Sequence, residues 1–72
     1  GPVSRGDAGT VAAHLEALGS LRDGEGQSLD DVVASYRRLA AATTDRCEST
    51  GRINAEQARR LREILAPEQL EG

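Results

Sequence analysis

Residues 29–49 have the sequence LDDVVASYRRLAAATTDRCES, the longest stretch of this 72-residue chain with one helical period. Apolar and small residues recur there every three or four positions, which predicts a long amphipathic helix. The predicted buried stripe consists of Leu29, Val32, Val33, Tyr36, Leu39, Ala40, Thr43 and Cys47. Three alanines at 40–42 allow a neighbouring helix to approach closely. We expect this helix to organise the fold.

The ends of this helix carry signals of their own. Ser28 precedes it and Asp31 follows three residues later, which resembles a capping box with a shorter acid. We therefore expect Ser28 to be the N-cap. Asp30 and Asp31 lie in the first turn, where the helix dipole favours negative charge. Gly51 is expected at C′, just past the last turn.

A shorter helix is expected before it, over residues 8–18. Asp7 is the predicted N-cap, and Gly19 is expected to end the helix. Its apolar positions are Val11, Leu15 and Leu18. A polar loop over residues 20–27 follows, from which we expect Leu21 to fold back onto the apolar face.

A third helix is expected over residues 55–66. Asn54 and Gln57 have the spacing of a capping box, and Pro67 stops the run. The inward positions are Ala58, Leu61, Ile64 and Leu65. We expect residues 68–72 to fray. No segment has the pattern of a strand, so the prediction is an all-α single domain over residues 1–72, with three helices and one long central helix.

The composition predicts a thin core. Of 27 hydrophobic residues, 11 are alanine, while Val, Leu and Ile together number 14 and Tyr36 is the sole aromatic. A chain of this size seldom gains more than about 3–5 kcal/mol from one core. We therefore expect one face of the domain to be buried against something else.

Charge and special residues exclude several classes of function. The net charge is −3, and no basic stripe is interleaved with aromatics, which counts against binding nucleic acid. No apolar run reaches the length of a membrane span. The single Cys47 cannot form an internal disulfide, so we expect a cytoplasmic protein. Because Met is absent, we expect the chain to be a piece of a longer protein.

The opening segment, GPVSRGDAGTVAAHLEAL, holds the candidate binding residues. Arg5 and Asp7 stand at the start of a helix, where an arginine and free backbone N–H groups suit a small anion. The simpler interpretation is that Asp7 caps the helix and Arg5 is solvated. His14, the only histidine, either packs at the border of the apolar face or joins Asp7 in a site. A metal site is not expected, since no second His or Cys is available.

This segment resembles the start of the C-terminal helical domain of a two-domain oxidoreductase family, some members of which are an alternative type of ketopantoate reductase. The family pattern is Gly-Pro-aliphatic-x-Arg-Gly-Asp, then Thr-Val and His-Leu. This chain supplies Gly1, Pro2, Val3, Arg5, Gly6, Asp7, Thr10, Val11, His14 and Leu15 in that order. Residues 34–65 also resemble the family's Tyr-bearing long helix, glycine turn and final helix. The loop at 20–27 departs from the family in being more charged and glycine-rich.

The resemblance implies a role in an NADP-dependent 2-oxoacid reductase of pantothenate synthesis. The enzyme's N-terminal Rossmann-like domain would bind NADP, and this helical domain would cover the substrate cleft and form the homodimer. Arg5 would contact the carboxylate of the small 2-oxoacid substrate, Asp7 would orient Arg5 or cap the helix, and His14 would line the cleft. No glycine-rich dinucleotide motif is present here, so no activity is expected from this chain alone.

Two alternatives belong to other classes of protein. A self-contained helical interaction module without enzymatic activity would show an exposed apolar groove and give Arg5 and Asp7 no special role. An acyl carrier protein would carry phosphopantetheine on Ser28, within the stretch Ser28-Leu29-Asp30. However, Gln27 replaces the aspartate expected before that serine, and the preceding connection is short.

Overall fold

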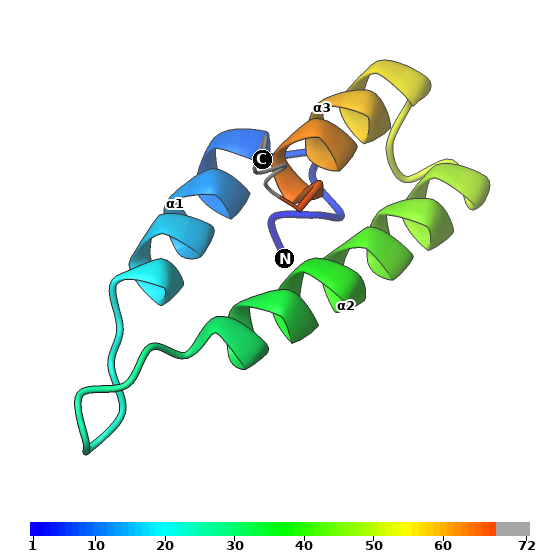
Figure 1. Cartoon of the computed structure of the whole chain (residues 1–72). Helices are drawn as coiled ribbons and strands as arrows, with labels where there is room; N and C mark the ends of the chain where they lie inside the picture. The colour runs from blue at the N-terminus through cyan, green and yellow to red at the C-terminus, as the bar shows by residue number, and fades with distance from the viewer. Residues whose placement is uncertain (68–72) are drawn as a thin grey trace, which may run out of the picture.

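A computed structural model describes residues 1–67, which form three helices (Figure 1). Helix α1 spans Ala8–Gly19, α2 spans Asp30–Ser49 and α3 spans Ala55–Leu65. Within the described residues there is no β-strand. The predicted all-α fold with three helices is therefore confirmed, and the second helix is the longest of them. The expected fraying of residues 68–72 lies outside the described residues.

Helices α1 and α2 diverge from the loop that joins them, and α3 lies at the wider end between them (Figure 1). Helix α3 contacts both of the others. The first residues of the chain run between α1 and α2, while the loop after α1 extends away from the helices (Figure 1). The opening segment is thus part of the packed structure.

The N-caps of α1 and α3 are the predicted ones. Asp7 caps α1: its Oδ1 accepts the backbone N–H of Thr10 at 3.1 Å, and its Oδ2 accepts the Thr10 hydroxyl at 2.7 Å. Asn54 and Gln57 form the capping box of α3, in which each side chain accepts the other's backbone N–H at 2.8 Å. These local signals suffice because they satisfy N–H groups that have no partner within the helix.

The predicted cap of α2 is wrong. Leu29 occupies the N-cap position and makes no side-chain capping bond, while Ser28 forms an isolated bridge with Arg22 across the loop. The loop is closed by Asp23, whose N–H donates to the carbonyl of Gln27 at 2.9 Å and whose Oδ1 accepts the N–H of Gln27 at 2.9 Å. This closure holds Ser28 in the loop, so α2 begins at its first aspartate without a serine cap.

The C-terminal end of α2 has the predicted glycine. Gly51 has φ +78°. Its N–H donates to the carbonyl of Glu48 at 3.1 Å, and the N–H of Arg52 donates to the carbonyl of Cys47 at 2.9 Å. This pair of bonds is the Schellman arrangement, which needs a residue that tolerates positive φ. It turns the chain sharply toward α3.

The core lies where the three helices and the opening segment meet. Its apolar members are Val3, Val11, Leu15, Ala40, Cys47, Ile53, Ala58, Leu61 and Leu65. Thr44 is fully buried among them, and its hydroxyl donates to the carbonyl of Ala40 at 2.8 Å. Most of the large side chains come from α1 and α3, whereas α2 contributes small ones. The prediction of a thin core is confirmed, because few large apolar side chains contribute to it.

The predicted stripe of α2 is partly wrong. Ala40 and Cys47 are buried as expected, but Leu39 is 70% exposed and Val32 is 45% exposed. Consecutive helical residues lie about 100° apart, so Leu39 and Ala40 cannot both face one narrow core. The contact side of α2 is the side of its small residues, and this excludes Leu39. Leu21 is also 49% exposed and does not fold back onto α1.

Polar side chains connect α2 with α3 at the edge of this core. The Arg37 guanidinium donates to the carbonyls of Ile64 and Ala66, both at 3.0 Å, and so satisfies carbonyls at the end of α3. Arg62 forms ion pairs with Asp45 and Glu48, each at 2.7 Å. Arg37 therefore has a structural partner that its sequence position alone did not indicate.

Candidate functional site

The opening segment forms a tight turn that leads into α1. The N–H of Gly6 donates to the carbonyl of Val3 at 2.9 Å, and the N–H of Asp7 donates to the carbonyl of Pro2 at 2.8 Å. Val3 is buried in the core, and Gly6 has φ +68°. The turn fixes the backbone on both sides of Arg5.

Arg5 and Asp7 form an exposed ion pair at the start of α1. Their nearest charged atoms lie 3.6 Å apart, and the Arg5 side chain is 63% exposed. The hydrogen bonds from Thr10, and then the charge of Arg5, lower the pKa of the Asp7 carboxyl. The guanidinium of Arg5 is largely exposed and presents N–H groups to solvent. Such a group is suited to a carboxylate or phosphate.

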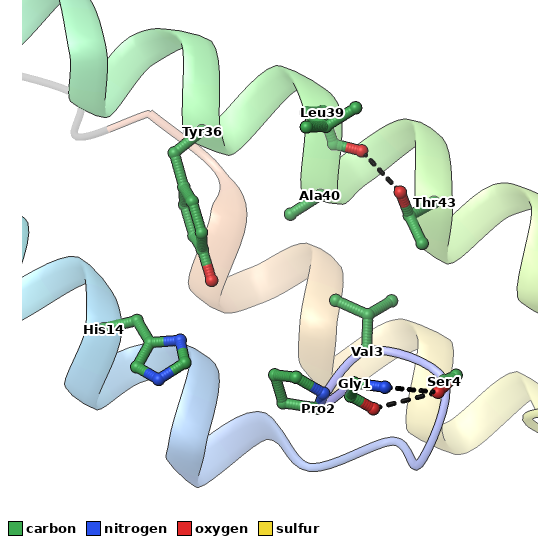
Figure 2. A pocket seen from close by; sticks show the side chains of 9 residues that line it. All are labelled: Gly1, Pro2, Val3, Ser4, His14, Tyr36, Leu39, Ala40 and Thr43. Atoms are coloured by element: carbon green, nitrogen blue, oxygen red, sulfur yellow. Dashed lines mark hydrogen bonds between the residues drawn. The ribbon is translucent and has the colours of Figure 1, made fainter.

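A cavity of about 320 Å³ opens between the opening segment, α1 and α2 (Figure 2). Its lining residues are Gly1, Pro2, Val3, Ser4, His14, Tyr36, Leu39, Ala40 and Thr43. Figure 2 shows the Tyr36 ring extending from α2 toward α1, with His14 on the opposite side. The cavity walls are mainly apolar, so the cavity suits an aliphatic or aromatic group better than a charged one.

Two of the four polar side chains that line this cavity are already bonded locally. The hydroxyl of Ser4 donates to the carbonyl of Gly1 at 2.9 Å, and that of Thr43 donates to the carbonyl of Leu39 at 2.9 Å (Figure 2). His14 and the Tyr36 hydroxyl are the polar groups left to fix the orientation of a ligand. A second cavity of about 330 Å³ is lined by His14, Ala17, Leu18 and Tyr36.

The structure does not gather the three predicted site residues into one cavity. His14 lines both cavities, whereas Arg5 and Asp7 line neither. Arg5 directly follows Ser4, which lines the first cavity. The sequence assigned Tyr36 to the core, and its helical spacing gave no signal that its ring would also form a cavity wall.

No family model, curated protein or solved structure matches this chain. Among residues 1–67, no group of three or more His, Cys, Asp or Glu side chains could hold a metal ion. None of the three helices is both long and apolar enough to cross a membrane.

Proposed function

We propose that this chain is the C-terminal helical part of an NADP-dependent 2-oxoacid reductase of the ketopantoate reductase type, a cytoplasmic enzyme of pantothenate synthesis. In this role it covers the substrate cleft and pairs two subunits, and it has no activity alone. The proposal rests on the resemblance of the opening segment and on one structural observation. Arg5 stands on a fixed turn with a largely exposed guanidinium, beside a residue that lines an apolar cavity.

The geometry suggests separate tasks for the candidate residues. The guanidinium of Arg5 binds the substrate carboxylate, because it can offer two parallel N–H donors. Asp7 holds the start of α1 and limits the movement of Arg5. His14 and Tyr36 line the cavity that would receive the aliphatic part of a 2-oxoacid.

The described residues, 1–67, do not include the strand and glycine-rich turn that place the pyrophosphate of a dinucleotide at a helix N-terminus. We therefore assign NADP to the N-terminal Rossmann-like domain of the proposed enzyme and derive no hydride-transfer step from these residues.

The test is the steady-state kinetics of the enzyme that contains this chain, with Arg5→Ala. Loss of a carboxylate contact should raise KM for the 2-oxoacid by about tenfold or more and leave KM for NADPH unchanged. Arg22→Ala is the matched control, because Arg22 is exposed in the loop. Unchanged kinetics for Arg5→Ala would show that Arg5 is a solvated surface residue with no role in substrate binding.

A second candidate is a self-contained helical interaction module. The exposure of Leu39, at 70%, favours it, because a large aliphatic side chain stands uncovered beside an apolar cavity. The coding sequence upstream of Gly1 separates the two proposals. A strand, a Gly-x-Gly-x-x-Gly turn and a helix there would support the reductase, and their absence would support the module.

A further inference from the structure

We propose that a second copy of this chain packs against α2, with the two α2 helices antiparallel. The contact surface, here called the α2 seam, consists of Val32, Ser35, Leu39, Ala42, Arg46 and Ser49. The inference rests on the dimerisation role in the proposed function, and it is independent of NADP and of the substrate.

The first observation is the spacing and exposure of the α2 seam. Its members recur at intervals of three and four residues, which is the spacing of the a and d positions in a helix pair, and all six are exposed. Three of them, Val32, Leu39 and Ala42, are apolar. The opposite side of α2 packs in the core through Ala40, Thr44 and Cys47. Helix α2 therefore has one face that packs in the core and a second face that the described part of the chain leaves exposed.

The second observation is the order of sizes along the seam. Positions 32, 39 and 46 carry Val, Leu and Arg, whereas 35, 42 and 49 carry Ser, Ala and Ser. In an antiparallel pair each large residue faces a small one: Leu39 faces Ala42 of the second copy, and Val32 faces Ser49. Large-to-small matching fills the space between helices. A parallel pair would instead place small residues opposite one another and Arg46 opposite Arg46.

The third observation is charge complementarity between the ends of α2. Asp30 and Asp31 are exposed in the first turn and Arg46 is exposed in the last, and none of them forms an ion pair within residues 1–67. In one helix, Asp31 and Arg46 lie about 22 Å apart at 1.5 Å per residue, too far to interact. Antiparallel pairing brings Arg46 within about one turn of Asp31 of the second copy, at both ends.

The experiment is sedimentation equilibrium of the whole chain over a concentration series, with circular dichroism on each sample. We expect a mass twice the 7.6 kDa of one chain. Leu39→Glu should raise the dimer Kd by at least about tenfold without loss of helix, since Leu39 is 70% exposed. Leu21→Glu is the control, because Leu21 is exposed in the loop and should leave Kd unchanged.

Charge reversal tests the antiparallel direction. Asp31→Arg and Arg46→Asp should each raise Kd about fivefold or more, because each places like charges together. The double variant should restore the original Kd, since each chain then supplies the opposite charge at both ends. Ala42→Leu should weaken an antiparallel pair by overfilling the space for Leu39, whereas it would strengthen a parallel one.

Several results would overturn this inference. They are a wild-type chain that stays monomeric throughout the series, a dimer insensitive to Leu39→Glu, and a double charge variant no better than the single ones. A monomer would point instead to another protein or domain on the seam. The proposed enzyme role is tested separately, by the effect of Arg5→Ala on KM for the 2-oxoacid.

Discussion

The side chain of Gln57 occupies the space in which a Cβ atom on Gly6 would lie. The amide nitrogen Nε2 comes within 2.7 Å of that position and Cδ within 2.8 Å. Gln57 also closes the capping box of α3. The opening turn and the first turn of α3, which are distant in sequence, are therefore packed against each other through a position that only glycine fits.

Gly6→Ala should destabilise the fold. The substitution adds a Cβ at φ +68° and also displaces the Gln57 side chain. We expect a loss of at least about 1–2 kcal/mol in the free energy of unfolding, measured by urea denaturation with circular dichroism. Gly9→Ala is the control, because the nearest atom to its new Cβ is Oδ1 of Asp7 at 3.8 Å. That variant should gain up to about 1 kcal/mol from better helix propensity, and a similar loss in both would contradict this account.

Leu61→Ala should be far more damaging than truncation of an exposed leucine. Leu61 is fully buried at the centre of the core, so the cavity left behind should cost about 2–5 kcal/mol. That range matches the whole stability expected of so small a core, and we expect loss of most helical signal at 25 °C. Leu21→Ala should change stability little. A folded Leu61→Ala chain with near-normal thermal unfolding would show that another contact carries the stability.

Asn54→Ala and Ser28→Ala should differ in their effect on the free energy of unfolding, although asparagine and serine are both good N-cap residues. Asn54 accepts the N–H of Gln57, and its loss should cost about 1 kcal/mol. Ser28 is exposed in the loop and does not cap α2, so its substitution should have little effect. Urea denaturation of the two variants side by side measures the difference. Equal losses would show that Ser28 caps α2 in solution.

Acid should weaken the fold through the carboxyls at the helix starts. Hydrogen bonds from Arg59 lower the pKa of Glu56 from 4.5 to about 2, and hydrogen bonds from Thr10 lower that of Asp7 below 3.8. In both cases the folded chain favours the ionised form, so the stabilisation is complete above the unfolded pKa. The contribution of Glu56 is lost as the pH falls from 4.5 toward 2, and that of Asp7 is lost as the pH falls below 3.8.

The thermal midpoint should therefore fall over this pH range, and Glu56→Gln should flatten part of that fall. Added salt should reduce the contribution of Glu56 to stability, since its ion pairs with Arg59 and Arg60 are exposed. Glu16→Gln is the control, because Glu16 is exposed and forms no ion pair within the described residues. An unaltered pH profile in the Glu56 variant would exclude this carboxyl as the cause.

The features that are local in the chain could be predicted from the sequence alone. The helical periods, the Asp7 and Asn54 caps and the Gly51 turn each depend on residues within a few positions of one another. For these features the hydrogen bonds form in the same way whatever the helices pack against, so the pattern was sufficient. The same holds for the thin core, which follows from the scarcity of large aliphatic residues. The equally local capping signal at Ser28 failed because a bridge to Arg22 and the closure of the loop by Asp23 hold Ser28 in the loop.

Which side of α2 is buried depends on how the three helices pack, and the sequence pattern did not predict it. Leu39 and Ala40 both belong to the apolar pattern of α2. Since leucine is more hydrophobic than alanine, the pattern favours Leu39 as the residue in the core. The close approach of α3 selects the side with Ala40, Thr44 and Cys47, because small side chains permit that approach and leucine does not. The cavity at Tyr36 was likewise set by the opening segment lying between two helices. These outcomes depend on contacts between segments that are distant along the chain, and a period of 3.6 residues carries no information about them.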